Sequence, residues 1–370
     1  MRSQKLPKPE RQCIYNSGYE TKNAKNPGPK TLEPGTSEPV NAYEKSYAVE
    51  SENLDNVFAH WQRDDDLLPW NCLFVLPVWL KTWWGNFGRN AALYLLSVRH
   101  EGRTIGIAPL QRSDDTVRFI GDKNVCDNLD FIVAPNNAAD FYHRLITYLK
   151  QDGVKRLELE PVRRDSSVMT HLLAVAEKTG CKISYADGDL SYALNLPGSW
   201  DDYLSILRGK ERHEIRRKLR RLDEAGQTNF RTVENAESVR EEIEIFLDLF
   251  RSNRSDKAEF MNDQMVSFFR ELAASLNEAR ILKLFFLDLN QIPVAATMCF
   301  SYRSTMYLYN NGYDKSFGSL SVGLLGKVLS IKESIQSGLQ IYDFLKGAEG
   351  YKQRLGGQPY QLYRCLIELP

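Results

Sequence analysis

ILKLFFLDLNQIPVAATMCFSY (residues 281–302) and IYDFLKGAEGYK (residues 341–352) are the segments that decide the fold of this 370-residue chain. Aromatic and branched apolar residues predominate on both sides of the polar turn at Asp288–Gln291, which predicts a β-hairpin. A third strand is expected at Met306–Asn310, then a loop, a helix that begins near Ser321, and a further strand. This order of strands and helix predicts an α/β fold.

The expected helix start near residue 321 has small side chains, in the run Gly318-Ser-Leu-Ser-Val-Gly323. The first turn of a helix exposes unpaired N–H groups at its positive dipole end, so it can bind phosphate. The alternative is an ordinary N-cap by Ser319 or Ser321. The run does not contain the glycine patterns of P-loop or dinucleotide-binding folds. The candidate phosphate-binding residues are Ser319, Ser321, Val322 and Gly323.

Composition separates the first 50 residues from the rest. Residues 1–50 are rich in Pro, Asn, Lys, Glu and Ser and poor in apolar clusters, so we expect a disordered tail. The tail has no apolar segment of the secretory type, and no run in the chain approaches the ~18 apolar residues of a membrane span. Six dispersed cysteines without C-x-x-C spacing indicate reduced thiols in a cytoplasmic protein. With five dispersed histidines, no metal site is expected.

A cationic segment occupies residues 208–221. It contains eight Lys or Arg and only two Glu, although the net charge of the chain is zero. Apolar residues recur at helical spacing around it, which predicts a helix docked by one stripe. That stripe comprises Leu204, Leu207, Ile215, Leu219 and Leu222. The cationic face can meet nucleic acid, anionic lipid or coenzyme A phosphates, and Arg216 is the candidate for the last. A solvated face is the open alternative.

Two segments resemble each other and suggest two related domains. Gly102-Arg-Thr-Ile-Gly-Ile-Ala-Pro109 and Asn290-Gln-Ile-Pro-Val-Ala-Ala-Thr297 both combine a polar turn with a strand of small and branched residues. The order of elements around them also matches. We therefore expect an N-terminal domain at residues 51–195, a C-terminal domain at residues 196–370, and a groove between them.

An ordered set of motifs resembles the acyltransferases of the GNAT fold, in particular the CelD-like group of cellulose biosynthesis, which is related to the Fem-type aminoacyltransferases. The motifs are Phe74…Pro77-x-Trp79-Leu…Trp83-Trp84…Phe87-Gly88, Gly106-Ile-Ala-Pro-Leu110, Asp127-Asn-Leu-Asp-Phe131, Leu196-Pro-Gly-Ser-Trp200, Arg212-His-Glu-Ile-Arg-Arg-Lys218 and Asp343-Phe-Leu-Lys-Gly-x-Glu349-x-Tyr-Lys352. The resemblance covers about residues 55–365 and implies tandem GNAT-like domains, an acyl-CoA co-substrate and acylation of an amine. The chain lacks the Q/R-x-x-G-x-G/A pyrophosphate signature of simpler GNAT enzymes.

Acylation of an amine needs the amine neutral, so a general base helps, and several residues are candidates. Glu349 lies at a strand exit beside Lys352, which we expect near the donor phosphates or the developing oxyanion. His213 and Glu214 lie within the cationic segment and form the alternative base. Asp127 and Asp130 are the candidates that hold the cationic amine of the acceptor. For each of these residues, a surface salt bridge or a turn remains the alternative role.

Three functions remain open from the sequence. The first is an acyl-CoA-dependent N-acyltransferase in the bacterial cytoplasm, with a small or lipid-linked amine as acceptor and a role in envelope or exopolysaccharide metabolism. Its cationic helix would contact an anionic membrane peripherally, and no cofactor would be bound permanently. The second is a Fem-like ligase that uses aminoacyl-tRNA, although nucleic acid is not the favoured partner. The third is a non-catalytic scaffold for polysaccharide synthesis.

Overall fold

The computed structural model describes residues 46–63, 68–253 and 259–370, which lie within one compact unit, Tyr43–Pro370. Most of the predicted tail, residues 1–45, lies outside the described residues. The predicted end of the tail at residue 50 is wrong, because Tyr47–Ser51 pairs with the strand Ala92–His100. The mixed polarity of this short strand gave no apolar signal in the sequence.

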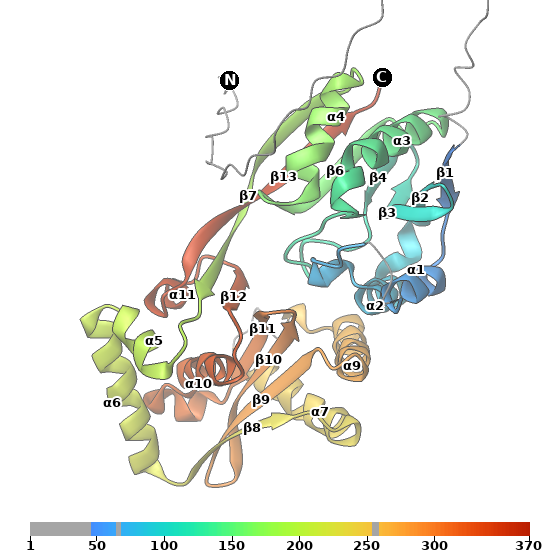
Figure 1. The fold of residues 1–370 in the computed structure, drawn as a ribbon. Helices are drawn as coiled ribbons and strands as arrows, with labels where there is room; N and C mark the ends of the chain where they lie inside the picture. Colours follow the sequence, from blue (N-terminus) through green and yellow to red (C-terminus); the bar gives the residue numbers. More distant parts are fainter. Residues whose placement is uncertain (1–45, 64–67, 254–258) are drawn as a thin grey trace, which may run out of the picture. The chain divides into compact units, whose positions relative to one another are not determined.

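The strands of the described residues form one mixed sheet in the order β1-β2-β3-β4-β6-β13-β7-β12-β11-β10-β9-β8, with β5 paired to β3 (Figure 1). The strands are β1 (Tyr47–Ser51), β2 (Ala92–His100), β3 (Arg103–Ser113), β4 (Thr116–Phe119), β5 (Ile132–Val133), β6 (Arg156–Arg163), β7 (Lys182–Asn195), β8 (Thr228–Val233), β9 (Leu282–Leu289), β10 (Ile292–Tyr302), β11 (Thr305–Tyr313), β12 (Ile341–Lys346) and β13 (Gln358–Glu368). The helices are α1 (Leu54–Trp61), α2 (Pro77–Phe87), α3 (Ala138–Gln151), α4 (Leu173–Lys178), α5 (Trp200–Ile206), α6 (Gly209–Ala225), α7 (Ala236–Asn253), α9 (Asp263–Glu278), α10 (Val322–Gln336) and α11 (Gly350–Arg354).

Both predicted hairpins are confirmed. The turn between β9 and β10 places Asn290 and Gln291 at φ 50° and 66°, and the turn between β2 and β3 places Glu101 and Gly102 at φ 50° and 77°. Turn residues with positive φ give the loop a twist that matches the twist of two antiparallel strands. The predicted third strand, the helix after Ser321 and the strand from Ile341 are also present, as β11, α10 and β12.

The cationic segment differs from its prediction in one respect. The structure breaks the expected apolar stripe at Leu207, where the backbone is extended (ψ 149°), so that α5 and α6 are separate helices. Ile215 and Leu222 of α6 are buried, as is Leu204 of α5. The exposed basic side chains of this helix are those of Lys210, His213, Arg216, Arg217, Arg220 and Arg221.

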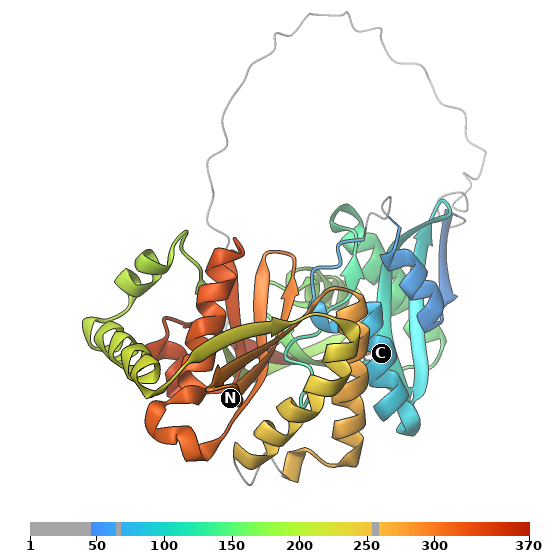
Figure 2. The same cartoon turned by 90° about the horizontal axis from the view of Figure 1, so that it is seen from below.

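Helices cover both faces of the strands β8–β11. Figure 2 shows α7 and α9 on one face and α10 on the other. The approach of α7 to β11 requires glycine at position 312, because a Cβ atom there would lie 2.4 Å from the Phe250 nitrogen. The core between α10 and the sheet contains Tyr342, Val328 and Ile331, with Tyr203 from α5 and Ile215 from α6.

The two halves of the chain share strands and core. β13, the last strand, pairs with both β6 and β7, and β7 in turn pairs with β12. One buried cluster contains residues of both halves, from Val57 to Ala176 and from Val233 to Phe300. The proposed division at residues 195 and 196 stays a prediction. Among the described residues, every helix is too short or too polar to cross a membrane.

Candidate active site

The sheet opens between β11 and β12. These parallel strands share three paired positions, ending at Tyr307 opposite Asp343. Beyond that pair β11 continues to Tyr313 alongside β10, whereas β12 continues alongside β7. In the described part of the chain, the end of β11 therefore pairs on one side only. An unpaired strand edge offers N–H and C=O groups to an extended ligand.

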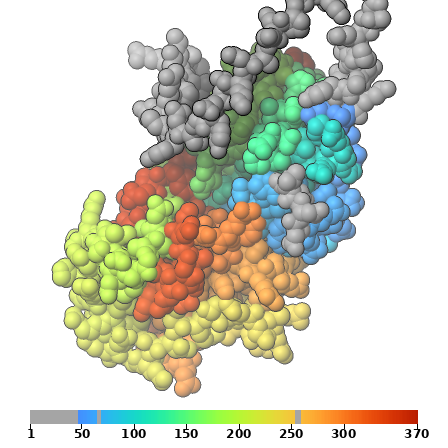
Figure 3. Space-filling view, in the orientation of Figure 1, coloured from blue at the N-terminus to red at the C-terminus, as the bar shows by residue number. Residues whose placement is uncertain are grey.

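The start of α10 lies next to this opening and carries a cation from another helix. Ser321, the N-cap of α10, is in the left-handed conformation (φ 60°), and its side chain does not cap the helix. Instead its hydroxyl accepts a hydrogen bond from Lys218 Nζ of α6, at 2.9 Å. In Figure 3 the yellow-green atoms of α6 lie at the surface next to the orange-red atoms of α10. A helix N-terminus with an adjacent ammonium group is suited to phosphate.

The predicted phosphate-binding residues occupy this helix start in different ways. Ser319 is exposed, and Ser321 is half-buried beside Lys218. Val322 is fully buried in a core cluster, so its side chain is not available to a ligand. A Cβ atom on Gly323 would lie 2.4 Å from Cδ1 of Tyr313. Glycine at this position is therefore explained by the packing of Tyr313.

The chain leaves β12 in a strained turn, and several side chains form hydrogen bonds with the backbone of this turn. Leu345 has φ 59°, a left-handed conformation that costs a residue with a side chain about 1–3 kcal/mol. Asp343 Oδ1 accepts the Leu345 N–H at 2.8 Å, and Asp127 Oδ1 accepts the Lys346 N–H at 2.9 Å. The buried Lys352 Nζ donates to the carbonyl oxygens of Leu345 (3.0 Å) and Lys346 (2.6 Å). These bonds fix the backbone at the mouth of the opening.

Glu349 and Lys352, two of the predicted catalytic residues, lie together at this turn. The distance from Lys352 Nζ to Glu349 Oε2 is 3.0 Å, and their side chains are 2% and 53% exposed. Partial burial favours the neutral form of Glu349, but the Lys352 ammonium, a backbone hydrogen bond and Lys327 together hold the pKa of this carboxyl below its usual value. Glu349 is thus an ionised, paired carboxylate with reduced basicity.

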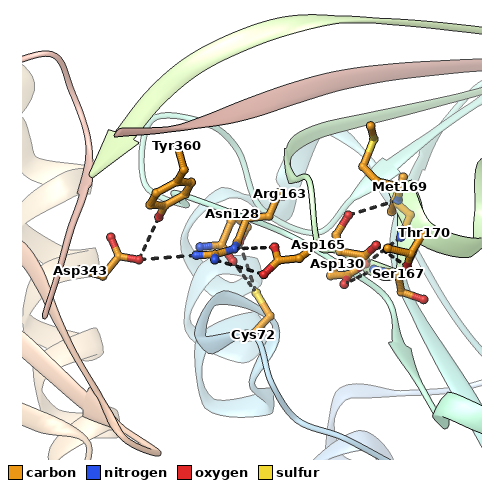
Figure 4. A network of polar contacts seen from close by, with 12 residues as sticks. Cys72, Asn128, Asp130, Arg163, Asp165, Ser167, Met169, Thr170, Asp343 and Tyr360 are labelled. Carbon is orange, nitrogen blue, oxygen red and sulfur yellow. Dashed lines mark hydrogen bonds and ion pairs between the residues drawn. The ribbon is translucent and has the colours of Figure 1, made fainter. Parts of the chain in front are cut away.

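A network of polar side chains adjoins the apex of the opening (Figure 4). Asp343 Oδ2 accepts the Tyr360 hydroxyl at 2.8 Å and lies 3.6 Å from Arg163 Nη1. Arg163 lies over the Tyr360 ring, 4.6 Å from its centroid, and also donates to Asp165 Oδ1 at 2.9 Å. Burial raises the pKa of Asp343 to about 6, against the opposing effect of the Leu345 N–H, Tyr360 and Arg163. Asp343 therefore titrates near neutrality.

The two predicted acceptor-binding carboxylates have different surroundings. Asp127 is buried at the exit of β12, and burial raises its pKa although Lys346 and Lys352 are near. Asp130 accepts the backbone N–H of Ser167 at 2.7 Å (Figure 4) and that of Phe131 at 2.9 Å. Burial raises the pKa of Asp130 to about 7 despite these bonds. In this structure Asp130 holds a loop against the turn at Ser167, whereas Asp127 lies at the candidate site.

The predicted residues His213, Glu214 and Arg216 lie on α6, which contacts the start of α10 through Lys218. Glu214 binds Arg217 at 2.8 Å and lies 3.5 Å from Lys218. The hydrogen bond from Arg217 lowers the pKa of Glu214 to about 2. His213 and Arg216 are exposed. Within the described residues, no hydrogen bond or ion pair joins His213 to Asp343, Glu349 or Lys352.

Sequence reasoning missed several residues of the site. Asp343 is part of a predicted motif, but nothing in the sequence placed Arg163 of β6 or Tyr360 of β13 beside it, because these contacts depend on the order of the strands in the sheet. Lys218 also stood in a quoted motif, and its contact with Ser321 depends on the docking of α6. Among the described residues, no group of three or more His, Cys, Asp or Glu side chains is placed to hold a metal ion.

Comparisons with known proteins identify the fold of the second half. Residues 209–353 match the family model of the acetyltransferase (GNAT) domain. The predicted α/β fold class is confirmed, with a GNAT domain in the second half of the chain. The crystal structure of FemX is similar over 86% of this chain and 96% of its own, with 13% identity and a TM-score of 0.60. A conserved protein of unknown function from Bacteroides thetaiotaomicron is similar over 86% and 99%, with 13% identity and a TM-score of 0.53. No curated protein sequence matches the chain.

Proposed function

We propose that this protein is an N-acyltransferase that moves an acyl group from acyl-CoA to an amine. The observation that carries the proposal is the opening between β11 and β12 beside the start of α10, where Lys218 adds a cation. The unpaired edge of β11 suits the amide-containing pantetheine arm, and the helix start suits the phosphates. Ser319, Ser321 and the backbone of Val322 and Gly323 would line the phosphate site, with Arg216 near it.

The reaction joins two substrates that the site must orient. The amine nitrogen attacks the thioester carbonyl, a C–N bond forms, the C–S bond breaks, and coenzyme A leaves as a thiolate while the amine gives up a proton. Holding the two reactants in a reactive orientation can lower the activation barrier by about 7 kcal/mol or more. The Lys352 ammonium, held at the exit of β12, would stabilise negative charge on the carbonyl oxygen or the donor. Asp127 would face the acceptor amine from the first half of the chain.

The acceptor and setting of the reaction belong to the same proposal. The motifs of the CelD-like group support an amine acceptor in envelope or exopolysaccharide metabolism, in the bacterial cytoplasm. The exposed cations of α6 support a peripheral contact with an anionic membrane, which would bring a lipid-linked amine to the site. Glu349 and the pair His213–Glu214 remain candidate bases. The ion pairs of Glu349 with Lys352 and of Glu214 with Arg217 make these two carboxylates weaker bases.

Coenzyme A binding and thiol release test the proposal. We expect millimolar acetyl-CoA to raise the melting temperature of the wild type, and thiol release to begin when an accepted amine is added. Lys218→Glu should abolish the shift because it places a carboxylate at the start of α10. Arg240→Glu, on the exposed surface of α7, has the same change in charge and should keep the shift. A wild-type melting temperature that no CoA thioester changes would refute the donor.

A second candidate function is a Fem-like ligase that takes its aminoacyl group from tRNA. The eight Lys and Arg of residues 208–221 favour it, because such a helix can follow nucleic acid phosphates. Binding of aminoacyl-tRNA that weakens steeply with salt, without any effect of CoA, would support this function over the first. A protein that binds neither donor would be the non-catalytic scaffold.

A further inference from the structure

We propose that Tyr360 and Asp343 form a proton relay that takes the proton from the acceptor amine. The inference rests on the proposed N-acyltransferase function and adds two residues to its site. It assigns to the relay the role of general base, which the sequence placed on Glu349 or on His213–Glu214.

The place of Asp343 in the sheet is the first argument. Asp343 is the last residue of β12 that pairs with β11, so it lies at the apex of the opening proposed for the acyl donor. Its side chain is 2% exposed, and Oδ1 is occupied by the Leu345 N–H. A group this buried does not reach a substrate amine directly. A proton from the amine can reach Asp343 only through an intermediate group that contacts both Oδ2, its other carboxylate oxygen, and the substrate.

Tyr360 is such an intermediate. Its hydroxyl donates to Asp343 Oδ2 at 2.8 Å, and its side chain is only half-buried. A phenol can accept one proton on its oxygen while it donates its own, so the pair transmits a proton without a change in the net charge of Tyr360. The tyrosine comes from β13 and the carboxylate from β12, and β7 lies between these strands.

The charges around the pair suit this transfer. Arg163 contacts both members, with Nη1 3.6 Å from Asp343 and its guanidinium 4.6 Å from the centre of the Tyr360 ring. It stabilises the resting carboxylate and any negative charge that passes over the phenol. Asp127 and Tyr307 are the other titratable groups that act on Asp343, and Asp165 lies beside Arg163. Farther from the pair, Cys72 acts on Tyr307, and Lys346 and Lys352 act on Asp127.

Every proton in the proposed acylation step has a donor and an acceptor. As the amine nitrogen bonds to the thioester carbon, its proton moves to Tyr360 Oη, and the former hydroxyl proton moves to Asp343 Oδ2. The C–S bond breaks and coenzyme A leaves as a thiolate. Asp343 then returns its proton to solvent through Tyr360. Because the pKa of Asp343 is raised to about 6, the carboxylate is ionised at neutral pH and still basic enough to accept the proton.

The test compares three single variants by pH-dependent thiol release from acetyl-CoA with an accepted amine. In the wild type, kcat/KM should rise with pH through about 6. Asp343→Asn should lose about a hundredfold or more in rate and lose this rise, since it removes the titrating group. Tyr360→Phe keeps the ring over Arg163 and should lose a similar factor. The double variant should be no slower than either single one.

The matched control is Tyr363→Phe, because Tyr363 lies on the same strand and its ring packs against Tyr185 at 6.2 Å. Its rate should stay within about twofold of the wild type, and all three variants should keep the melting shift with acetyl-CoA. If Asp343→Asn or Tyr360→Phe retains the wild-type rate and pH profile, the relay is wrong while the transferase function stands. If the wild type releases no thiol with any amine, the proposed function fails, and the relay with it.

Discussion

At the scale of single residues, the exit of β12 shows how buried charge holds an unfavourable backbone conformation. Leu345 adopts a left-handed conformation that a branched side chain rarely adopts, and three charged side chains bind the backbone around it. Asp343 and Lys352 come from the same half of the chain, whereas Asp127 comes from the other. The turn is therefore stable only when both halves are folded.

Asp130 provides a prediction for the dependence of stability on pH. Its folded pKa is raised to about 7 from an ordinary value of 3.8, so the folded state binds more protons than the unfolded state between these values. The contribution of Asp130 to stability is therefore greatest below pH 4 and falls as the pH rises to 7. Asp130→Asn should remove this slope, a change of about 2–4 kcal/mol between pH 4 and 7. Urea unfolding of both proteins at several pH values measures it.

Asp165→Asn is the control for this prediction. The Arg163 guanidinium holds the pKa of Asp165 below its ordinary value, although partial burial opposes it. Its contribution to stability is present above pH 4 and is lost as the pH falls, so this variant should not flatten the slope between pH 4 and 7. Equal slopes for the wild type and Asp130→Asn would mean that Asp130 keeps an ordinary pKa in the folded protein.

At the scale of elements, the sequence predicted what depends on local pattern. Alternating and branched apolar residues identified the hairpin of β9 and β10, and small residues before an apolar period identified α10. β8 and β13 were not predicted. β8 gives little apolar signal, since Val233 is its one buried residue. β13 has buried apolar residues at Leu362, Cys365 and Ile367, but they did not identify it as a strand. The relay pair Asp343–Tyr360 was missed with it, because β13 brings Tyr360 to the site.

The cationic helix α6 provides a prediction at this scale. Its buried residues Ile215 and Leu222 hold it to the protein, while Arg216 and Arg221 are exposed. Reversal of both arginines to glutamate should therefore keep the fold but weaken binding to vesicles that contain anionic lipid. Each cation near an anionic surface contributes about 1 kcal/mol, so reversal of two should cost tenfold or more in affinity. Vesicle sedimentation at low salt measures the change.

The control for α6 carries the same charge change elsewhere. Arg89 and Arg240 are exposed and lie outside α6, so their reversal to glutamate should leave vesicle binding almost unchanged. If the two double variants lose affinity equally, the net charge of the protein matters and α6 has no special role. If neither loses affinity, the exposed face of α6 is simply solvated.

At the scale of the whole compact unit, one tryptophan joins the halves. Trp79 of α2 is fully buried, and its ring packs edge-on against Phe268 at 6.2 Å, Phe300 at 5.7 Å and Tyr309 at 5.5 Å. The Tyr309 hydroxyl also donates to the Val125 carbonyl at 3.0 Å. A core shared in this way couples the folding of both halves, because neither half buries its own aromatic face alone.

Cooperative unfolding is therefore expected, although the chain is long enough for two domains. Five of the six tryptophans precede residue 90, so fluorescence reports mainly on the first half, while circular dichroism reports on both. The two signals should give one shared midpoint in urea. Phe300→Ala, a change in the second half, should lower both midpoints equally, with a loss of about 3–5 kcal/mol from the cavity beside Trp79. Exposed Ile292→Ala on the same strand should cost far less. Fluorescence that keeps its wild-type midpoint in Phe300→Ala would show that the first half folds on its own, which would separate the halves at the division near residue 195.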